Sequence, residues 1–137
     1  MRSVWISFAL ALAVMVAPMP AAAANFDGSK PLLLAVISIF ECAPESGCQQ
    51  VSPAEAGIPR FMEIDFQKME INEVGEFEDE RRTPIKTLNK GDGTLSLQGG
   101  ENNRSWSAVI KQDSGEAVIT VSDVHSGFVL FGACTPR

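Results

Sequence analysis

The sequence predicts an all-β protein, an antiparallel up-and-down barrel of about eight strands, with a β-sandwich as the alternative. Three observations support this fold class. Apolar and polar residues alternate with the two-residue period of half-buried strands. Turn residues, glycine above all, recur about every ten residues, which is typical of hairpin-connected antiparallel strands. Helical periodicity is scarce, and we expect only one short helical turn, near residues 53–56.

The first strand is expected at 32–40, a run of Leu, Val, Ile and Phe relieved only by Ala35 and Ser38. The run is short and rich in β-branched residues, which favours a strand over a helix. Because apolar residues occupy both alternating positions, both faces of this strand should be at least partly covered.

Residues 42–57 are expected to be irregular, apart from one turn of helix. Ser52 is a suitable N-cap, Pro53 suits the first helical position, and Glu55 can complete a capping box. Gly57 follows at once and limits the helix to a single turn.

Seven further segments between turn residues are strand candidates, which brings the expected total to eight. They are 61–66, 69–71, 83–88, 94–98, 105–110, 117–121 and 128–131. Pro84 lacks a backbone N–H, so the strand at 83–88 should begin at an edge or a bulge. Clusters of Gly, Asn, Asp and Ser predict turns at 89–93, 99–103, 113–115 and 123–127.

The N-terminus has the three parts of a secretory signal peptide. Arg2 supplies the positive charge, residues 4–16 form an apolar stretch, and an Ala-x-Ala triplet ends at Ala24. We expect cleavage there, which removes 1–24 and leaves 25–137 as a single β domain in the periplasm or outside the cell. The 13-residue apolar stretch is short of the roughly 20 residues that span a bilayer, so no stable membrane insertion is expected after cleavage.

The chain is acidic. It carries 17 acidic and 11 basic residues, a net charge of −6, and loss of Arg2 would bring this to about −7. Phosphates and anionic headgroups would be repelled, so we expect neither nucleic acid nor anionic lipid as a partner. A basic protein is compatible with this charge.

Three cysteines in an exported chain predict one disulfide and one remaining thiol. Cys42 and Cys48 flank a turn-like stretch, Ala-Pro-Glu-Ser-Gly, and we predict that they pair locally. Pairing of Cys134 with one of them is the alternative. In an eight-stranded barrel the first and last strands pair antiparallel, which would place Cys42 and Cys134 toward opposite ends and favours the local bridge. The remaining thiol would be buried or would link two chains.

No combination of residues predicts an enzyme, a metal site or a cofactor. Glu63 and Asp65 lie two apart on one strand, but alternation puts both on the polar face, where both should stay ionised. The single histidine, His125, lies in the segment 123–127, whose composition is that of a surface turn rather than of a catalytic triad. The three cysteines and His125 match no zinc-ligand spacing.

The polar stretch 73–82 is expected to be a solvated loop. Its acidic cluster is the candidate surface for a basic partner, and consists of Glu76, Glu78, Asp79 and Glu80.

Trp106 alternates with Ala108 and Ile110 and is the only tryptophan outside the predicted signal peptide. This pattern predicts a core position, with ligand stacking at the barrel mouth as the alternative. A barrel of eight strands has an interior that side chains just fill or that holds one small ligand. Given the large apolar residues available, we expect a filled interior.

A resemblance rests on five short segments of the predicted domain. They are Phe40-Glu41-Cys42 with Cys48 soon after, Ala56-Gly57-Ile58-Pro59-Arg60-Phe61, Leu95-Ser96-Leu97-Gln98-Gly99, Arg104-Ser105-Trp106-Ser107 and Phe131-Gly132-Ala133-Cys134. Together they resemble small exported bacterial β-domain proteins of unassigned function. This resemblance covers most of the chain after residue 25 and implies no activity.

A fainter similarity is to the periplasmic inhibitors of c-type lysozyme, which are small eight-stranded barrels. Their first strand has a cysteine after an aromatic residue, and another cysteine lies near the C-terminus; Cys42 and Cys134 occupy such places here. Their Ser-Gly-x-x-Tyr inhibitory loop is missing, because the chain contains no tyrosine. No inhibitory residue is therefore carried over.

We expect an exported, non-enzymatic binding or envelope-associated protein, with its specificity in 42–60 or 73–82, because loops on a rigid β scaffold usually carry specificity. One alternative is a carrier of a small apolar ligand within the barrel. Its cavity would be lined by Met62, Ile64, Leu95, Leu97 and Trp106. Another is an inhibitor of a basic cell-wall hydrolase such as lysozyme, which would bind through the acidic cluster.

Overall fold

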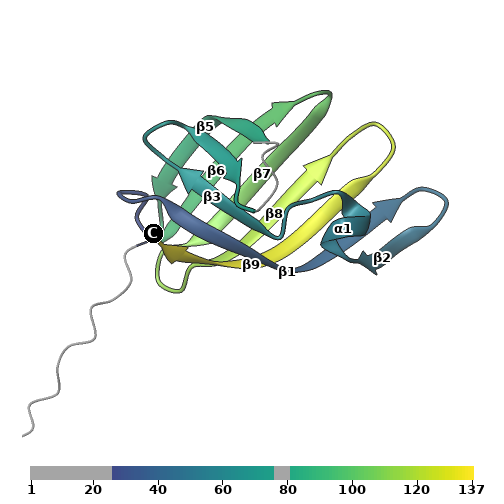
Figure 1. Ribbon diagram of the computed structural model, residues 1–137, viewed down its shortest axis with the longest axis horizontal. Coiled ribbons are helices and arrows are strands. Elements are labelled where there is room, and N and C mark those ends of the chain that lie inside the picture. The colour runs from purple at the N-terminus through teal and green to yellow at the C-terminus, as the bar shows by residue number, and fades with distance from the viewer. Residues whose placement is uncertain (1–25, 76–80) are drawn as a thin grey trace, which may run out of the picture.

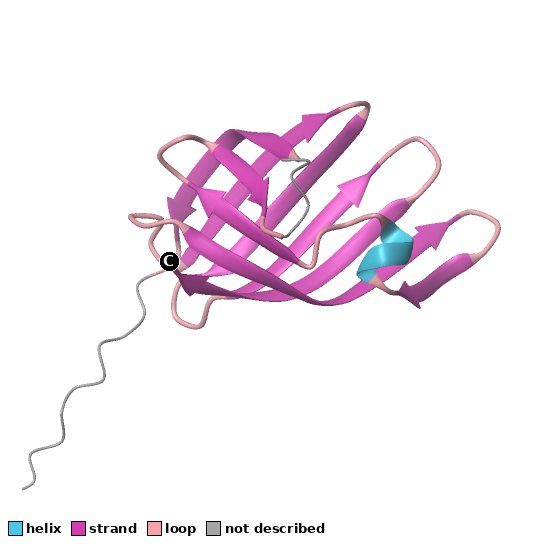
Figure 2. Ribbon diagram, in the orientation of Figure 1, coloured by secondary structure: helices cyan, strands magenta, loops and turns pink. Residues whose placement is uncertain are grey.

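The computed structural model describes residues 26–75 and 81–137, which form nine strands and one short helix (Figures 1 and 2). The strands are β1 (Leu32–Ala43), β2 (Gly47–Val51), β3 (Phe61–Asp65), β4 (Glu70–Glu73), β5 (Arg82–Gly91), β6 (Thr94–Glu101), β7 (Arg104–Lys111), β8 (Glu116–Ser122) and β9 (Gly127–Pro136). The helix is α1 (Pro53–Ala56). Residues 1–24, the predicted signal peptide, lie outside the described residues.

Eight of the strands close into an antiparallel barrel, as predicted. From β3 to β9 each strand pairs with the next, and β1 pairs with both β3 and β9. In the closing pair, Leu34 lies opposite Cys134 and Cys42 lies opposite Gly127. The two cysteines therefore lie toward opposite ends of the barrel, as the antiparallel pairing requires.

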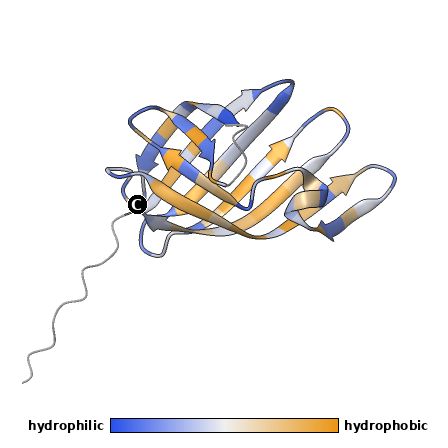
Figure 3. Cartoon of the chain, viewed as in Figure 1, coloured by the Kyte–Doolittle hydropathy of each residue, from blue (hydrophilic) through white to orange (hydrophobic). Residues whose placement is uncertain are grey.

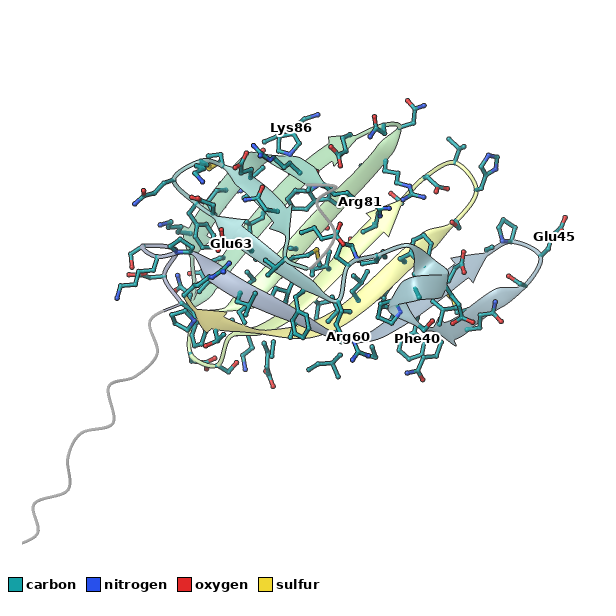
Figure 4. The ribbon with its side chains drawn as sticks, in the orientation of Figure 1. Phe40, Glu45, Arg60, Glu63, Arg81 and Lys86 are labelled. Carbon is teal, nitrogen blue, oxygen red and sulfur yellow. A yellow bond between two sulfur atoms is a disulfide. The ribbon has the colours of Figure 1, made fainter. Side chains whose placement is uncertain are left out.

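The ninth strand, β2, was not predicted, and the expectation of an irregular segment at 42–57 is wrong for this part. β2 forms a hairpin with β1 in which Ile39 faces Val51 and Ala43 faces Gly47. The hairpin projects past the barrel (Figure 1), and Glu45 lies at its tip (Figure 4). Because β2 is almost entirely exposed, its residues lack the apolar alternation by which strands are predicted.

The helix α1 is the predicted single turn. Glu55 Oε2 accepts from the backbone N–H of Ser52 over 2.8 Å, and Ser52 Oγ accepts from the N–H of Glu55 over 3.3 Å, which completes the capping box. Gly57 ends the helix with φ of 62°. Among residues 26–75 and 81–137, no helix is long and apolar enough to cross a membrane.

Two of the hairpin turns are tighter than predicted. Asp92 and Gly93 have φ of 51° and 74°, and Asn102 and Asn103 have φ of 49° and 62°. Two successive residues with positive φ are the mark of a two-residue turn that follows the twist of the strands. Consequently β5 and β6 extend into the segments 89–93 and 99–103 that were predicted as turns. The bulge predicted near Pro84 lies just after it, between Ile85 and Thr87.

The core lies inside the barrel, where alternate residues of the strands point. Figure 3 shows hydrophobic colour along most of β1, whose residues contribute to both faces. Burial of these side chains supplies the main driving force for folding. The largest fully buried side chains are Leu32, Leu34, Ile39, Ile64, Leu95, Leu97, Ile110 and Leu130.

The segment before β1 closes the barrel end at which the described chain terminates. Phe26 is 5% exposed. Gly115, in the β7–β8 turn, has φ of 74°, and a Cβ there would approach the Phe26 ring to 2.6 Å and the backbone oxygen of Cys134 to 2.7 Å. Gly115 therefore permits Phe26 to pack beneath the last residues of β9. The opposite end of the barrel is the mouth.

Candidate functional site

A cavity of about 110 Å³ lies inside the barrel on the side of the mouth. Seven of the eight barrel strands contribute to its lining, together with Ile58 from the α1–β3 connection. The lining residues are Leu34, Ile58, Met62, Ile64, Ile71, Thr83, Trp106, Ala108, Ile110, Ala117, Ile119, Val121 and Leu130. The lining is almost wholly apolar, so the cavity suits an apolar molecule.

The cavity corrects the expectation of a filled interior. Ala108 lies opposite Ile119, and Ile110 lies opposite Ala117, so each of these β7–β8 pairs contains one short side chain. Two alanines in the lining leave space that leucine or isoleucine would occupy.

The cavity lining differs in part from the residues predicted for a carrier. Met62, Ile64 and Trp106 line it as predicted. Leu95 and Leu97 are fully buried on β6 but are not among the lining residues. Sequence alternation identified the interior face correctly, but it does not show where along that face space is left.

Trp106 is part of both the core and the cavity wall. Its indole Nε1–H donates a hydrogen bond to Thr83 Oγ1 over 2.9 Å. A Cβ at Gly99 would approach the indole ring to 2.4 Å, so the ring lies against the backbone of β6. The two polar side-chain groups of the lining thus bond to each other.

A second hollow, of about 170 Å³, forms the mouth and connects the cavity to the surface. It shares six lining residues with the cavity: Ile58, Met62, Ile71, Thr83, Trp106 and Val121. Charged residues surround it, and they are Glu73, Arg81, Arg82, Glu101 and Arg104. The site is therefore an apolar chamber behind a charged rim.

Arg81 holds the α1–β3 connection against the rim. Its Nη1 donates to the backbone oxygen of Gly57 over 3.1 Å, and its Nε lies 3.9 Å from Glu73 Oε2. Arg81, labelled in Figure 4, directly precedes β5. Because Ile58 follows Gly57 and lines both cavity and mouth, Arg81 positions a residue that borders the entrance.

The disulfide is the predicted local one. Cys42 and Cys48 face each other in the β1–β2 hairpin, with a Cα–Cα distance of 4.0 Å, and their sulfur atoms are bonded. Such a bond is characteristic of an oxidising compartment. Cys134 is a free thiol, 8% exposed, and burial raises its pKa to about 12. The remaining thiol is therefore buried.

The prediction that Asp65 lies on the polar face of its strand is wrong. Asp65 is 7% exposed, not on a solvated face. Its Oδ1 accepts the backbone N–H groups of Gln67 and Lys68, each over 3.0 Å, and thereby caps the β3–β4 turn. The hydrogen bond from Lys68 N–H is the main reason that the pKa of Asp65 lies below its ordinary value. Glu63 instead forms an ion pair with Arg137.

His125 lies exposed in the surface turn that was predicted at 123–127. Asp123 Oδ1 accepts the backbone N–H of His125 over 2.7 Å and that of Ser126 over 2.9 Å. Within the described part of the chain, no group of three or more His, Cys, Asp or Glu residues is placed to hold a metal ion.

The candidate partner-binding residues Glu76, Glu78, Asp79 and Glu80 lie outside the described residues. Binding of a basic hydrolase through them therefore stays a prediction.

No family model, curated protein or solved structure matches the chain. Function is therefore inferred from the geometry of the cavity and its mouth. Two features of this site, Ile58 and Arg81, were not identified from the sequence. The capping box before Ile58 was the available signal, because it fixes where the chain leaves α1.

Proposed function

We propose that the protein is an exported, non-enzymatic binding protein, periplasmic or secreted, whose barrel holds one small apolar ligand. The observation that carries this proposal is the apolar cavity that shares its lining with the mouth. Ligand sites are typically concave and mostly apolar, and the mouths of β-barrels are among their preferred places. The disulfide and the predicted signal peptide support the location.

The chemistry of the lining favours an apolar ligand over water. A buried water needs two to four polar partners. In this lining Trp106 Nε1–H and Thr83 Oγ1 already bond to each other, and the remaining side chains are apolar. An apolar molecule that leaves water for this cavity gains the hydrophobic free energy of transfer.

Native mass spectrometry of the protein purified from its own source tests the proposal. We expect a non-covalent mass on the wild-type chain. Ala108→Leu should abolish it, because the larger side chain occupies the cavity. Val109→Leu is the matched control, since Val109 is the next residue of β7, is 46% exposed and points outward. A bare mass for all three proteins would contradict the proposal, as would a ligand that Ala108→Leu retains.

A further inference from the structure

The interior of the site, as far as the structure describes it, offers no charged partner, and its only hydroxyl group is that of Thr83. Among the described lining residues, Thr83 and Trp106 carry the polar side-chain atoms, and the indole N–H is already used by Thr83 Oγ1. A carboxylate or an ammonium group placed there would lose its hydration for at most one hydrogen bond, to the Thr83 hydroxyl. The part of a ligand that enters the cavity is therefore neutral.

The rim does not provide a ready anchor for a charged headgroup. Arg81 is bonded to Gly57 and paired with Glu73, and Arg104 Nε lies 3.6 Å from Asp123 Oδ2. Arg82 also has an interaction partner. An anionic headgroup would have to displace one of these carboxylates, and it would also approach Glu101. A cationic headgroup would instead meet three arginines.

The volume of the cavity sets the size of the ligand. A cavity of about 150 Å³ lined by Leu, Ile and Phe stays dry and binds benzene or xenon. The present cavity, at about 110 Å³, is somewhat smaller and has the same kind of lining. It matches a single six-membered ring, and a small substituent on the ring would point into the mouth, which shares six lining residues with the cavity.

We propose that the ligand is a neutral monocyclic molecule of the size of benzene or toluene, held wholly inside the barrel. This inference rests on the proposed function and specifies the ligand class of the same site. Affinity should depend on the space beside Ala117, because this alanine leaves part of the cavity open. The rim charges should contribute little, because the ligand ends behind them.

Titration of toluene, benzoate and octanoate, followed by tryptophan emission, tests this inference. The full chain also contains Trp5, so a Trp5→Phe background isolates Trp106. We expect saturable binding of toluene, and binding of benzoate weaker by at least about tenfold, because its charge cannot be paired in the cavity. Stronger binding of benzoate or octanoate than of toluene would overturn the ligand class and leave the binding function in place. If none of the three binds while the wild-type chain carries a non-covalent mass, the ligand class fails and the binding function stands; if that mass is absent as well, both fail.

Two variants locate the bound ring. Ala117→Leu should abolish toluene binding, while Val118→Leu, at the next and outward-pointing position of β8, should retain it. Ile110→Ala should enlarge the cavity and shift the preference from toluene toward propylbenzene. The Ile110→Ala variant keeps the test decisive if Ala117→Leu does not fold. Toluene binding that neither substitution changes would overturn the inference.

Discussion

The indole of Trp106 on β7 donates its hydrogen bond to Thr83 on β5, across 2.9 Å, although β6 lies between these two strands. The ring passes over Gly99 of β6. A Cβ on Gly99 would lie 2.4 Å from the ring and 2.3 Å from the backbone oxygen of Pro84. Three consecutive strands are thus linked at the mouth by one side chain, and the link depends on the absence of a side chain between them.

Thr83→Val should remove the acceptor and leave the indole N–H unpaired. The expected loss is about 1 kcal/mol in the free energy of unfolding, the low end of the cost of an unsatisfied donor, because this bond is only partly buried. Urea unfolding measures it. Thr87→Val is the matched control, because Thr87 lies on the same strand and is exposed. Equal stability of the two variants would show that the Trp106–Thr83 bond contributes nothing.

Gly99→Ala should displace the indole from the β6 backbone. The added methyl group meets both the ring and a backbone oxygen, so we expect a loss of about 1–3 kcal/mol in the free energy of unfolding. Trp106 emission in the Trp5→Phe background should shift as the ring moves. Gly91→Ala is the control, since a Cβ at Gly91 has nothing within 4 Å. Unchanged emission in Gly99→Ala would contradict the described packing.

The strands of the barrel were predictable because each buries one face. Leu95 and Leu97 alternate with Ser96, and this local pattern alone fixes which residues point inward. The same logic failed for β2, since Gly47–Val51 lies outside the barrel and only Val51, at its end, is partly buried. It also failed for Asp65, whose burial follows from the turn that it caps.

The cavity could be predicted only in part, because it depends on contacts between distant segments. Alternation placed Trp106 on the inner face, but its hydrogen bond to Thr83 is set by the register of three strands. Likewise, Arg81 contacts Gly57 across 24 positions of sequence. Such pairs leave no periodic trace in the sequence, so the position of the empty space emerges only from the folded barrel.

Removal of the disulfide should have a local effect. Cys42→Ala combined with Cys48→Ala removes a bond between residues with a sequence separation of 6. The chain entropy of a loop of this length corresponds to a loss of about 2 kcal/mol in the free energy of unfolding. Because β2 lies outside the closed barrel, hydrogen exchange should accelerate at 47–51 and stay slow at 95–97. The disulfide-bonded chain is the reference. Equal acceleration in both segments would show that the hairpin stabilises the whole barrel.

Cys134 should make stability fall at alkaline pH. Burial raises the pKa of its thiol from 9.0 to about 12, so the folded state holds this proton after an unfolded chain has released it. Its contribution to the free energy of unfolding is fully present below pH 9 and is lost progressively as the pH rises toward about 12.

Comparison with Cys134→Ala isolates this contribution, because lysine titration affects both chains alike. We expect the difference in unfolding free energy between wild type and Cys134→Ala to be constant from pH 7 to pH 8 and to turn against the wild type by pH 11. Parallel pH profiles for the two chains would show that the thiol ionises as readily in the barrel as in the unfolded chain. They would also contradict the burial of Cys134 in the core.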